Sequence, residues 1–229
     1  MSAKQKIIQG YPHVTYEPEE IAEATMLERS SDFYKWLDKR RSVRHFSEKE
    51  VPEAVIQNII QSAGTAPSGA HKQPWTFCAV SNPQLKTEIR NAAEIEEEQN
   101  YNARMRDRWL KDLEPLGTNT NKEFLEVAPW LIIVFKKVFE LNEQEEKSTN
   151  YYVNESVGIA CGMLISAIHN AGLVTLTHTP SPMNFLADLL KRPKNERAFL
   201  LVPVGYCAKD AYVPQIERKE LQEISQFYK

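Results

Sequence analysis

The sequence has none of the short motifs that identify several common enzyme classes. It contains no GxGxxG segment, so a Rossmann-type dinucleotide domain has no support, and it contains no Walker-type loop to hold a nucleoside triphosphate. A GxSxG elbow, an HExxH helix and zinc-binding cysteine pairs are absent as well. The five histidines are scattered along the chain, and no metal site is predicted.

Cysteine is scarce, with three residues in 229 and no CxxC pair. An odd and widely spaced set argues against a disulfide framework. Cys78, Cys161 and Cys207 each lie in an apolar stretch, which favours three buried thiols in a reducing compartment.

Neither a strong charge excess nor a long apolar run is present. The formal net charge is -3 and the pI is about 6.0, which gives no basic field for nucleic acid or an anionic membrane surface. The most apolar stretch, residues 156–168, is too short to span a bilayer, and no secretory h-region follows the first residues. We therefore expect a cytoplasmic protein with no nucleic-acid or membrane partner.

The remaining pattern is that of a globular protein of the α+β or α/β class, with few strands and long helices. Residues 1–16 read as an extended arm, 140–150 as a surface loop, and the tail from 212 as a polar segment suited to wrapping a partner. Helices are expected at 17–41, 52–64, 83–113, 121–127, 151–170 and 183–190. Strands are expected at 75–80, 130–135, 174–179 and 198–206.

Two segments have residues suited to binding an anion. Residues 40–44 contain three arginines and a serine, and guanidinium groups match phosphate oxygens in pairs. Residues 67–71, Pro-Ser-Gly-Ala-His, combine a glycine that permits close backbone approach with successive N–H groups that cradle negative charge. Taken alone, the first could equally be a solvated basic corner and the second an ordinary turn.

Three further groups have polar residues at suggestive positions. Glu97 and Tyr101 share a helix face and Lys122 follows, so together they could hold an amino-acid zwitterion; an acidic helix run is more often simply solvated. The hydroxyls of 175–180 could bind a cofactor or pair across strands. Arg218 near the C-terminus is no signal by itself.

The order and spacing of these pieces resemble the nitroreductase superfamily and, more narrowly, its iodotyrosine deiodinase family. The resemblance covers about residue 25 to the end, with a preceding arm at 1–24. It rests on RRSVR at 40–44, AGTAPSGAH at 63–71, NYNARMRDRWLKDL at 100–113, NAGLVTLTHTP at 170–180 and PVGY at 203–206. The set of Glu97, Tyr101 and Lys122 is its most specific part.

This resemblance implies a nitroreductase-like fold, in which a small central mixed sheet is surrounded by helices and two chains intertwine as a homodimer. FMN would lie at the dimer interface, and each site would use residues of both chains. The small-residue helix at 151–170 would pack in the dimer. The cofactor contacts would come from Arg40, Arg41, Ser42, Val43, Arg44, Pro67, Ser68, Thr177, His178, Thr179 and Arg218.

The same resemblance implies the substrate contacts. Glu97 would bind the amino group of a halotyrosine, Lys122 its carboxylate, and Tyr101 would complete the hydrogen bonding. The N–H of Ala70 would receive the phenolate oxygen, and Thr179 would lie near flavin N5, so both are expected to take part in catalysis. A lid of about residues 95–122 would close over the substrate.

The reaction implied is reductive removal of iodide or bromide from a halotyrosine, with electrons drawn from NAD(P)H directly or through a reductase. Alternatives are a general NAD(P)H-dependent nitro or quinone reductase, a flavin- or halotyrosine-binding protein without turnover, and a flavin-destroying enzyme of cobalamin-ring synthesis. The zwitterion residues argue against the last.

Overall fold

The computed structural model describes residues 4–229, and the chain divides into two compact units. The first unit ends at Lys39 and contains β1 (Gln5–Ile8), β2 (Tyr11–Val14) and α1 (Glu23–Asp38). The extended arm expected over 1–16 is wrong for 5–14, and its first three residues lie outside the described part. Gln9 and Gly10 adopt φ of 50° and 85°, the left-handed turn that lets β1 and β2 pair as a hairpin. The arm boundary expected after residue 24 stays a prediction.

The second unit, Arg40–Lys229, is built on a four-stranded sheet. Its strands lie in the order β3 (Trp75–Val80), β4 (Trp130–Lys137), β8 (Glu196–Gly205) and β7 (Val174–Thr175). The three pairings between these strands are antiparallel. The parallel contact expected of a mixed sheet is the bridge between Ser42 and Thr175.

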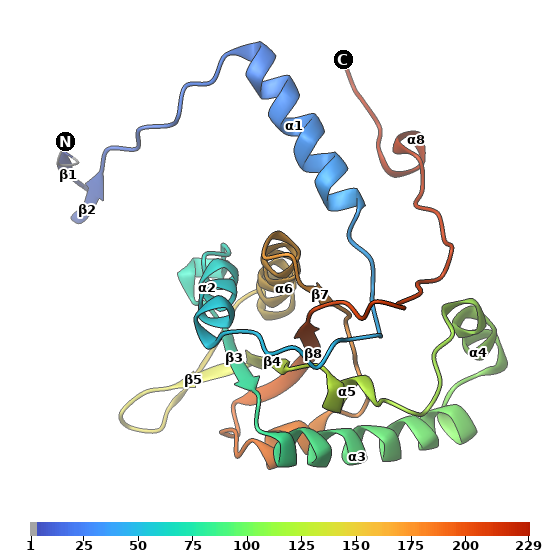
Figure 1. The fold of residues 1–229 in the computed structure, drawn as a ribbon. Helices are drawn as coiled ribbons and strands as arrows, with labels where there is room; N and C mark the ends of the chain where they lie inside the picture. The colour runs from blue at the N-terminus through green and yellow to red at the C-terminus, as the bar shows by residue number, and fades with distance from the viewer. Residues whose placement is uncertain (1–3) are drawn as a thin grey trace. The chain divides into compact units, whose positions relative to one another are not determined.

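Two layers of helices bury the two faces of this sheet. Alternate residues of β4 face opposite sides: Ile132 and Val134 belong to one apolar cluster, and Leu131, Ile133 and Phe135 to the other. The first cluster contains residues of α2 (Glu53–Gly64) and α6 (Val153–Asn170), which lie side by side (Figure 1). The second contains residues of α3 (Pro83–Gln99), α5 (Phe124–Val127) and α7 (Asn184–Leu189).

Several predicted elements agree with the structure. The expected strand at 75–80 is β3, and the helix expected to end at Gly64 is α2. Asn82 explains the start of α3, because its side chain accepts a hydrogen bond from the N–H of Leu85 at 2.9 Å and Pro83 fills the first helical turn.

The single helix expected at 83–113 is wrong. After α3 the chain forms a π-helical turn at Asn100–Arg104, and Met105 is extended, with φ -80° and ψ 137°. A separate helix, α4 (Asp107–Leu113), and a 3-10 turn at Glu114–Leu116 follow. The region predicted to form a lid therefore contains several short helical pieces after α3.

Other differences are smaller. The surface loop expected at 140–150 contains the hairpin of β5 (Phe139–Leu141) and β6 (Lys147–Thr149). The strand expected at 174–179 keeps only two residues in β7, although His178 forms an isolated bridge with Leu201. The polar tail carries one short helix, α8 (Leu221–Ile224).

The prediction of three buried thiols holds for one of them. Cys161 is buried in α6, Cys78 is half-buried in β3, and Cys207 is exposed, because it follows the end of β8 where the chain leaves the sheet. None of the helices over residues 4–229 is long and apolar enough to cross a membrane.

Candidate functional site

The arginine-rich segment that opens the second unit faces the C-terminal tail across a cavity of about 280 Å³. Arg40, Arg41, Ser42 and Arg44 line one side, and Ile216, Glu217 and Arg218 line the other, with Leu116 and Pro214 beside them. The structure therefore brings Arg218 to the predicted anion-binding segment. The tail residues other than Arg218 were not predicted.

Backbone and side-chain hydrogen bonds fix this arrangement. The N–H of Val43 donates to the carbonyl of Thr175 at 3.1 Å, which attaches the segment to the edge of the sheet. Arg218 Nη2 donates to the carbonyl of Arg40 at 2.8 Å, and Arg41 donates to the carbonyl of Pro214. The segment and the tail are thus tied together at two points.

Positive charge accumulates in this cavity. Burial lowers the pKa of Arg40, and the neighbouring cations Arg218 and Arg41 lower it further. Burial also lowers the pKa of Arg44, against the influence of Tyr101. Guanidinium groups held this close repel one another, and a bound phosphate would relieve that repulsion.

The loop predicted to cradle an anion has an unusual backbone. Ala70, His71 and Gln73 have positive φ of 48°, 55° and 47°. The two hydrogen bonds of the 3-10 turn Gly69–His71 are donated by His71 and Lys72, so neither uses the N–H of Ala70. Strain of this kind clusters at functional sites.

This loop packs against the start of α6. The N–H of Gly69 donates to Ser156 Oγ at 3.3 Å, and a Cβ on Gly69 would lie 3.0 Å from the carbonyl oxygen of Tyr151. This distance is shorter than most Cβ contacts, so the close approach favours glycine at this position. Ser68 Oγ accepts from the N–H of Gln73 at 2.9 Å. The described contacts of the loop are thus with α6, rather than with the Glu97 group.

The predicted zwitterion residues do meet. Glu97 and Lys122 are both buried, and Glu97 Oε2 lies 3.5 Å from Lys122 Nζ. Lys122 Nζ also lies 5.8 Å from the centre of the Tyr101 ring. Two residues that the sequence did not indicate hold the ammonium group: Lys122 donates to the carbonyl of Asn119 and to Thr118 Oγ1.

Burial shifts the pKa values of Glu97 and Lys122 in opposite directions. It raises the pKa of Glu97 and lowers the pKa of Lys122, and in each case the opposite charge of the partner counteracts it. A buried carboxylate beside a buried ammonium suits a ligand that carries both charges, because each charge of the ligand can pair with the opposite charge of the protein.

In the segment that follows β7, successive side chains point to opposite sides. Thr177 and Thr179 are exposed, whereas His178 is buried between them. His178 Nδ1 lies 4.0 Å from Glu97 Oε1, so the imidazole belongs to the Glu97 group and not to the threonine face. The sequence grouped His178 with the threonines as cofactor contacts, although period-two alternation places it on the opposite face.

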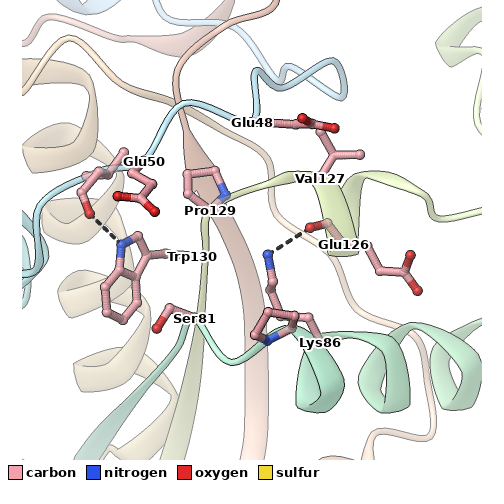
Figure 2. A pocket seen from close by; sticks show the side chains of 10 residues that line it. Glu48, Glu50, Ser81, Lys86, Glu126, Val127, Pro129 and Trp130 are labelled. Carbon is pink, nitrogen blue, oxygen red and sulfur yellow. Dashed lines mark hydrogen bonds between the residues drawn. The ribbon is translucent and has the colours of Figure 1, made fainter.

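A larger cavity of about 610 Å³ lies elsewhere in the second unit, and none of the predicted site residues lines it. Two of its lining side chains, Lys86 and Trp130, make hydrogen bonds that stabilise the fold (Figure 2). Lys86 Nζ donates to the carbonyls of Glu126 and Ala128 at 2.7 and 2.8 Å, and Trp130 Nε1 donates to the carbonyl of Val51 at 2.8 Å. These contacts hold the end of α5 and the start of β4 in place.

Comparison with known proteins agrees with this geometry. The model of the nitroreductase family matches residues 37–206. Iodotyrosine deiodinase of Haliscomenobacter hydrossis is 56% identical over 218 residues, which cover 95% of this chain and 96% of that protein. Iodotyrosine deiodinase 1 of Homo sapiens is 47% identical over 221 residues, 96% of this chain and 76% of the human protein.

Solved structures give the same result. Oxidized iodotyrosine deiodinase bound to FMN and 3-iodo-L-tyrosine matches with a TM-score of 0.75 and 29% identity, covering 86% of this chain and 99% of that one. A nitroreductase with bound FMN from Bacteroides fragilis matches with a TM-score of 0.64 at 20% identity, over 86% and 99% of the two chains. The second match shows the fold alone.

Proposed function

The chain belongs to the nitroreductase family and, within it, to the iodotyrosine deiodinases, and from this premise we propose that it uses FMN to remove iodide reductively from iodotyrosines. The observation that carries the proposal is the approach of buried Glu97 to buried Lys122, with the half-buried Tyr101 ring near the ammonium. Arg44 of the arginine-lined cavity acts on the same ammonium and lowers the pKa of Lys122. A nitro or quinone reductase has no need of a zwitterion site.

The residues of the arginine-lined cavity fit the phosphate of FMN. Arg218 and Arg41 repel the Arg40 guanidinium, and the three guanidinium groups would supply paired donors to phosphate oxygens. Ser42 and Arg44 line the same cavity and Val43 lies between them in the chain; Pro67 and Ser68 would contribute from the second loop. When bound, FMN supplies the two electrons of the reaction, while these residues bind and orient it.

The substrate contacts follow from the charges of the pocket. Glu97 would accept hydrogen bonds from the substrate's ammonium, Lys122 would bind its carboxylate, and Tyr101 would add its hydroxyl. The N–H of Ala70 would donate to the phenolate oxygen, where negative charge is held during the reaction. The exposed hydroxyl of Thr179 is the proposed donor to flavin N5.

Replacement of iodide by hydrogen needs two electrons and one proton, and releases one iodide ion. The zwitterion contacts place the ring, and the closed lid excludes water. Bromotyrosine would follow the same route. We propose NAD(P)H as the ultimate electron source, either directly or through a reductase. A cytoplasmic location stays a prediction.

We also propose that the active form is a homodimer with FMN at its interface. In support, Gly158, Ile159 and Gly162 are exposed on one face of α6, and a Cβ built on either glycine meets no atom within 4 Å other than neighbouring residues and nearby backbone of α6 itself. The tail likewise exposes large apolar side chains, including Tyr212, Leu221, Ile224 and Phe227. Light scattering should give a mass close to twice 26.4 kDa, and Ile159→Glu should shift it toward the monomer.

The function is tested with the purified FMN-loaded protein, dithionite as the electron source and 3-iodotyrosine as substrate. Tyrosine and free iodide should appear together. Rapid reduction of nitroaromatics with NADPH and no iodide release would indicate a general reductase. Saturable binding of iodotyrosine with no release of iodide would indicate a binding protein.

A further inference from the structure

His178 is a buried side chain whose hydrogen bonding is incomplete. It is 7% exposed, and its Nε2 has no hydrogen-bond partner among residues 4–229. Its backbone is fixed, because its N–H donates to the carbonyl of Leu201 at 2.9 Å and its carbonyl accepts from the N–H of Leu201 at 3.0 Å. These two bonds anchor the backbone from which the imidazole projects toward Glu97.

The surroundings of the ring define what it can do. Glu97 Oε1 lies 4.0 Å from Nδ1, and the Phe124 ring packs edge-on with centroids 5.7 Å apart. Burial lowers the pKa of His178 to about 3, and the cations Lys122 and Arg44 add to this effect. The imidazole is thus neutral near pH 7 and has one N–H to donate.

The carboxylate of Glu97 lies between Lys122 and His178. Its Oε2 faces Lys122 at 3.5 Å, while its Oε1 is about 1 Å too far from His178 for a good hydrogen bond. When a substrate carboxylate binds Lys122, it competes with Glu97 for the ammonium group. Glu97 then needs new donors, and the substrate's ammonium alone leaves one carboxylate oxygen poorly satisfied.

We propose that His178 is a positioning residue of the substrate site: its Nδ1–H donates to Glu97 when the amino acid enters and holds the carboxylate toward the substrate's ammonium. This inference rests on the proposed function. His178 lies between Thr177 and Thr179, so it links the strand end proposed to contact FMN with the α3 carboxylate proposed to bind the substrate.

Three substitutions separate this role from simple packing. His178→Asn keeps an N–H donor near the position of Nδ1, His178→Gln moves the donor toward the position of Nε2, and His178→Leu removes it. Each is measured for FMN content, thermal stability and the Kd of 3-iodotyrosine by quenching of flavin fluorescence. Leu and Gln should weaken binding about tenfold, and Asn should remain within about threefold of the wild type, because the bond involves a charged group.

A double-mutant cycle with Glu97→Gln provides the second readout. His178→Leu should have little further effect on Kd once Glu97 is Gln, since the two residues act through one contact. Should His178→Leu fail to retain FMN, the comparison of Asn with Gln, each alone and with Glu97→Gln, carries the same test.

Unchanged binding in His178→Leu, equal losses in Asn and Leu, or additive effects with Glu97→Gln would each overturn the proposal. These outcomes can be distinguished from failure of the proposed function. If the proposed function were wrong, the wild-type protein itself would neither bind 3-iodotyrosine nor release iodide.

Discussion

Glu97 Oε2 and Lys122 Nζ lie 3.5 Å apart with both side chains less than 10% exposed. The two residues come from different elements, α3 and the segment before α5. In the absence of a substrate each charge serves as the other's counterion. A halotyrosine zwitterion carries an ammonium that can pair with Glu97 and a carboxylate that can pair with Lys122. Its binding therefore replaces one buried ion pair with two.

Glu97→Gln should weaken halotyrosine binding by about 1.5–3 kcal/mol, the range for a hydrogen bond to a charged group. The amide keeps the size of the side chain but cannot neutralise the substrate's ammonium. FMN should remain bound, because Glu97 does not line the arginine cavity. Fluorescence titration of the holoprotein with 3-iodotyrosine measures the change.

Glu98→Gln is the matched control, because Glu98 is the next residue on α3 and is exposed. The Kd of Glu98→Gln for 3-iodotyrosine should equal that of the wild type. Equal affinity in Glu97→Gln would remove Glu97 from the substrate site.

Arg40→Gln should lower FMN affinity by about tenfold or more, because a charged hydrogen bond to phosphate is lost. The protein without FMN should be no less stable than the wild type, because the substitution relieves the repulsion by Arg41 and Arg218 that lowers the pKa of Arg40. Arg108→Gln, an exposed site on α4, is the control. Parallel loss of apoprotein stability and FMN affinity would point to a purely structural arginine.

Gly69→Ala should destabilise the protein by about 1–3 kcal/mol, as overpacking does elsewhere. The new Cβ would lie 3.0 Å from the backbone oxygen of Tyr151 and 3.2 Å from Tyr152 Cδ2. Turnover should fall as well, because the shift displaces the N–H of Ala70. A Cβ on Gly64, which lies in α2, meets no clash, so Gly64→Ala should leave turnover unchanged and stabilise the protein by up to about 1 kcal/mol in urea unfolding; equal behaviour of the two variants would refute the packing argument.

Acid should destabilise the protein partly through His178. Its pKa is about 3 in the folded state against an ordinary value of 6.5, so between these values the unfolded state binds more protons and the free energy of unfolding falls as the pH drops. Glu97 has a raised pKa and acts in the opposite direction. His178→Asn should therefore lose less stability than the wild type in urea titrations at about pH 7 and pH 5. Identical pH dependence would contradict a neutral, buried imidazole.

Local patterns predicted the elements whose boundaries are set locally. The apolar run at 75–80 lies between prolines and became β3, and the helix ending at Gly64 became α2. The break after Gln99 coincides with contacts that do not follow helical spacing. Asn100 Nδ2 donates to the carbonyl of Ser181 at 2.7 Å, and Arg104 turns back to Glu96 at 2.7 Å. The helical periodicity of the sequence does not predict these hydrogen bonds.

In the candidate site, too, some residues could be predicted from the sequence and others could not. The arginines at 40–44 and the set of Glu97, Tyr101 and Lys122 could be proposed from residue type and spacing. The place of His178 beside Glu97 could not, because residues far apart in sequence meet only in the folded chain. The alternation of Thr177, His178 and Thr179 was the available signal that the imidazole faces away from the threonines.

The most direct test of the account is a single-turnover reaction. The FMN-loaded protein is reduced anaerobically, freed of excess reductant and mixed with 3-iodotyrosine, while flavin absorbance, iodide and tyrosine are followed. We predict that flavin reoxidation, iodide release and tyrosine formation proceed together in equal amounts. Reduced flavin that stays reduced in the presence of bound substrate, with no iodide released, would contradict the assignment of this chain as an iodotyrosine-reducing enzyme.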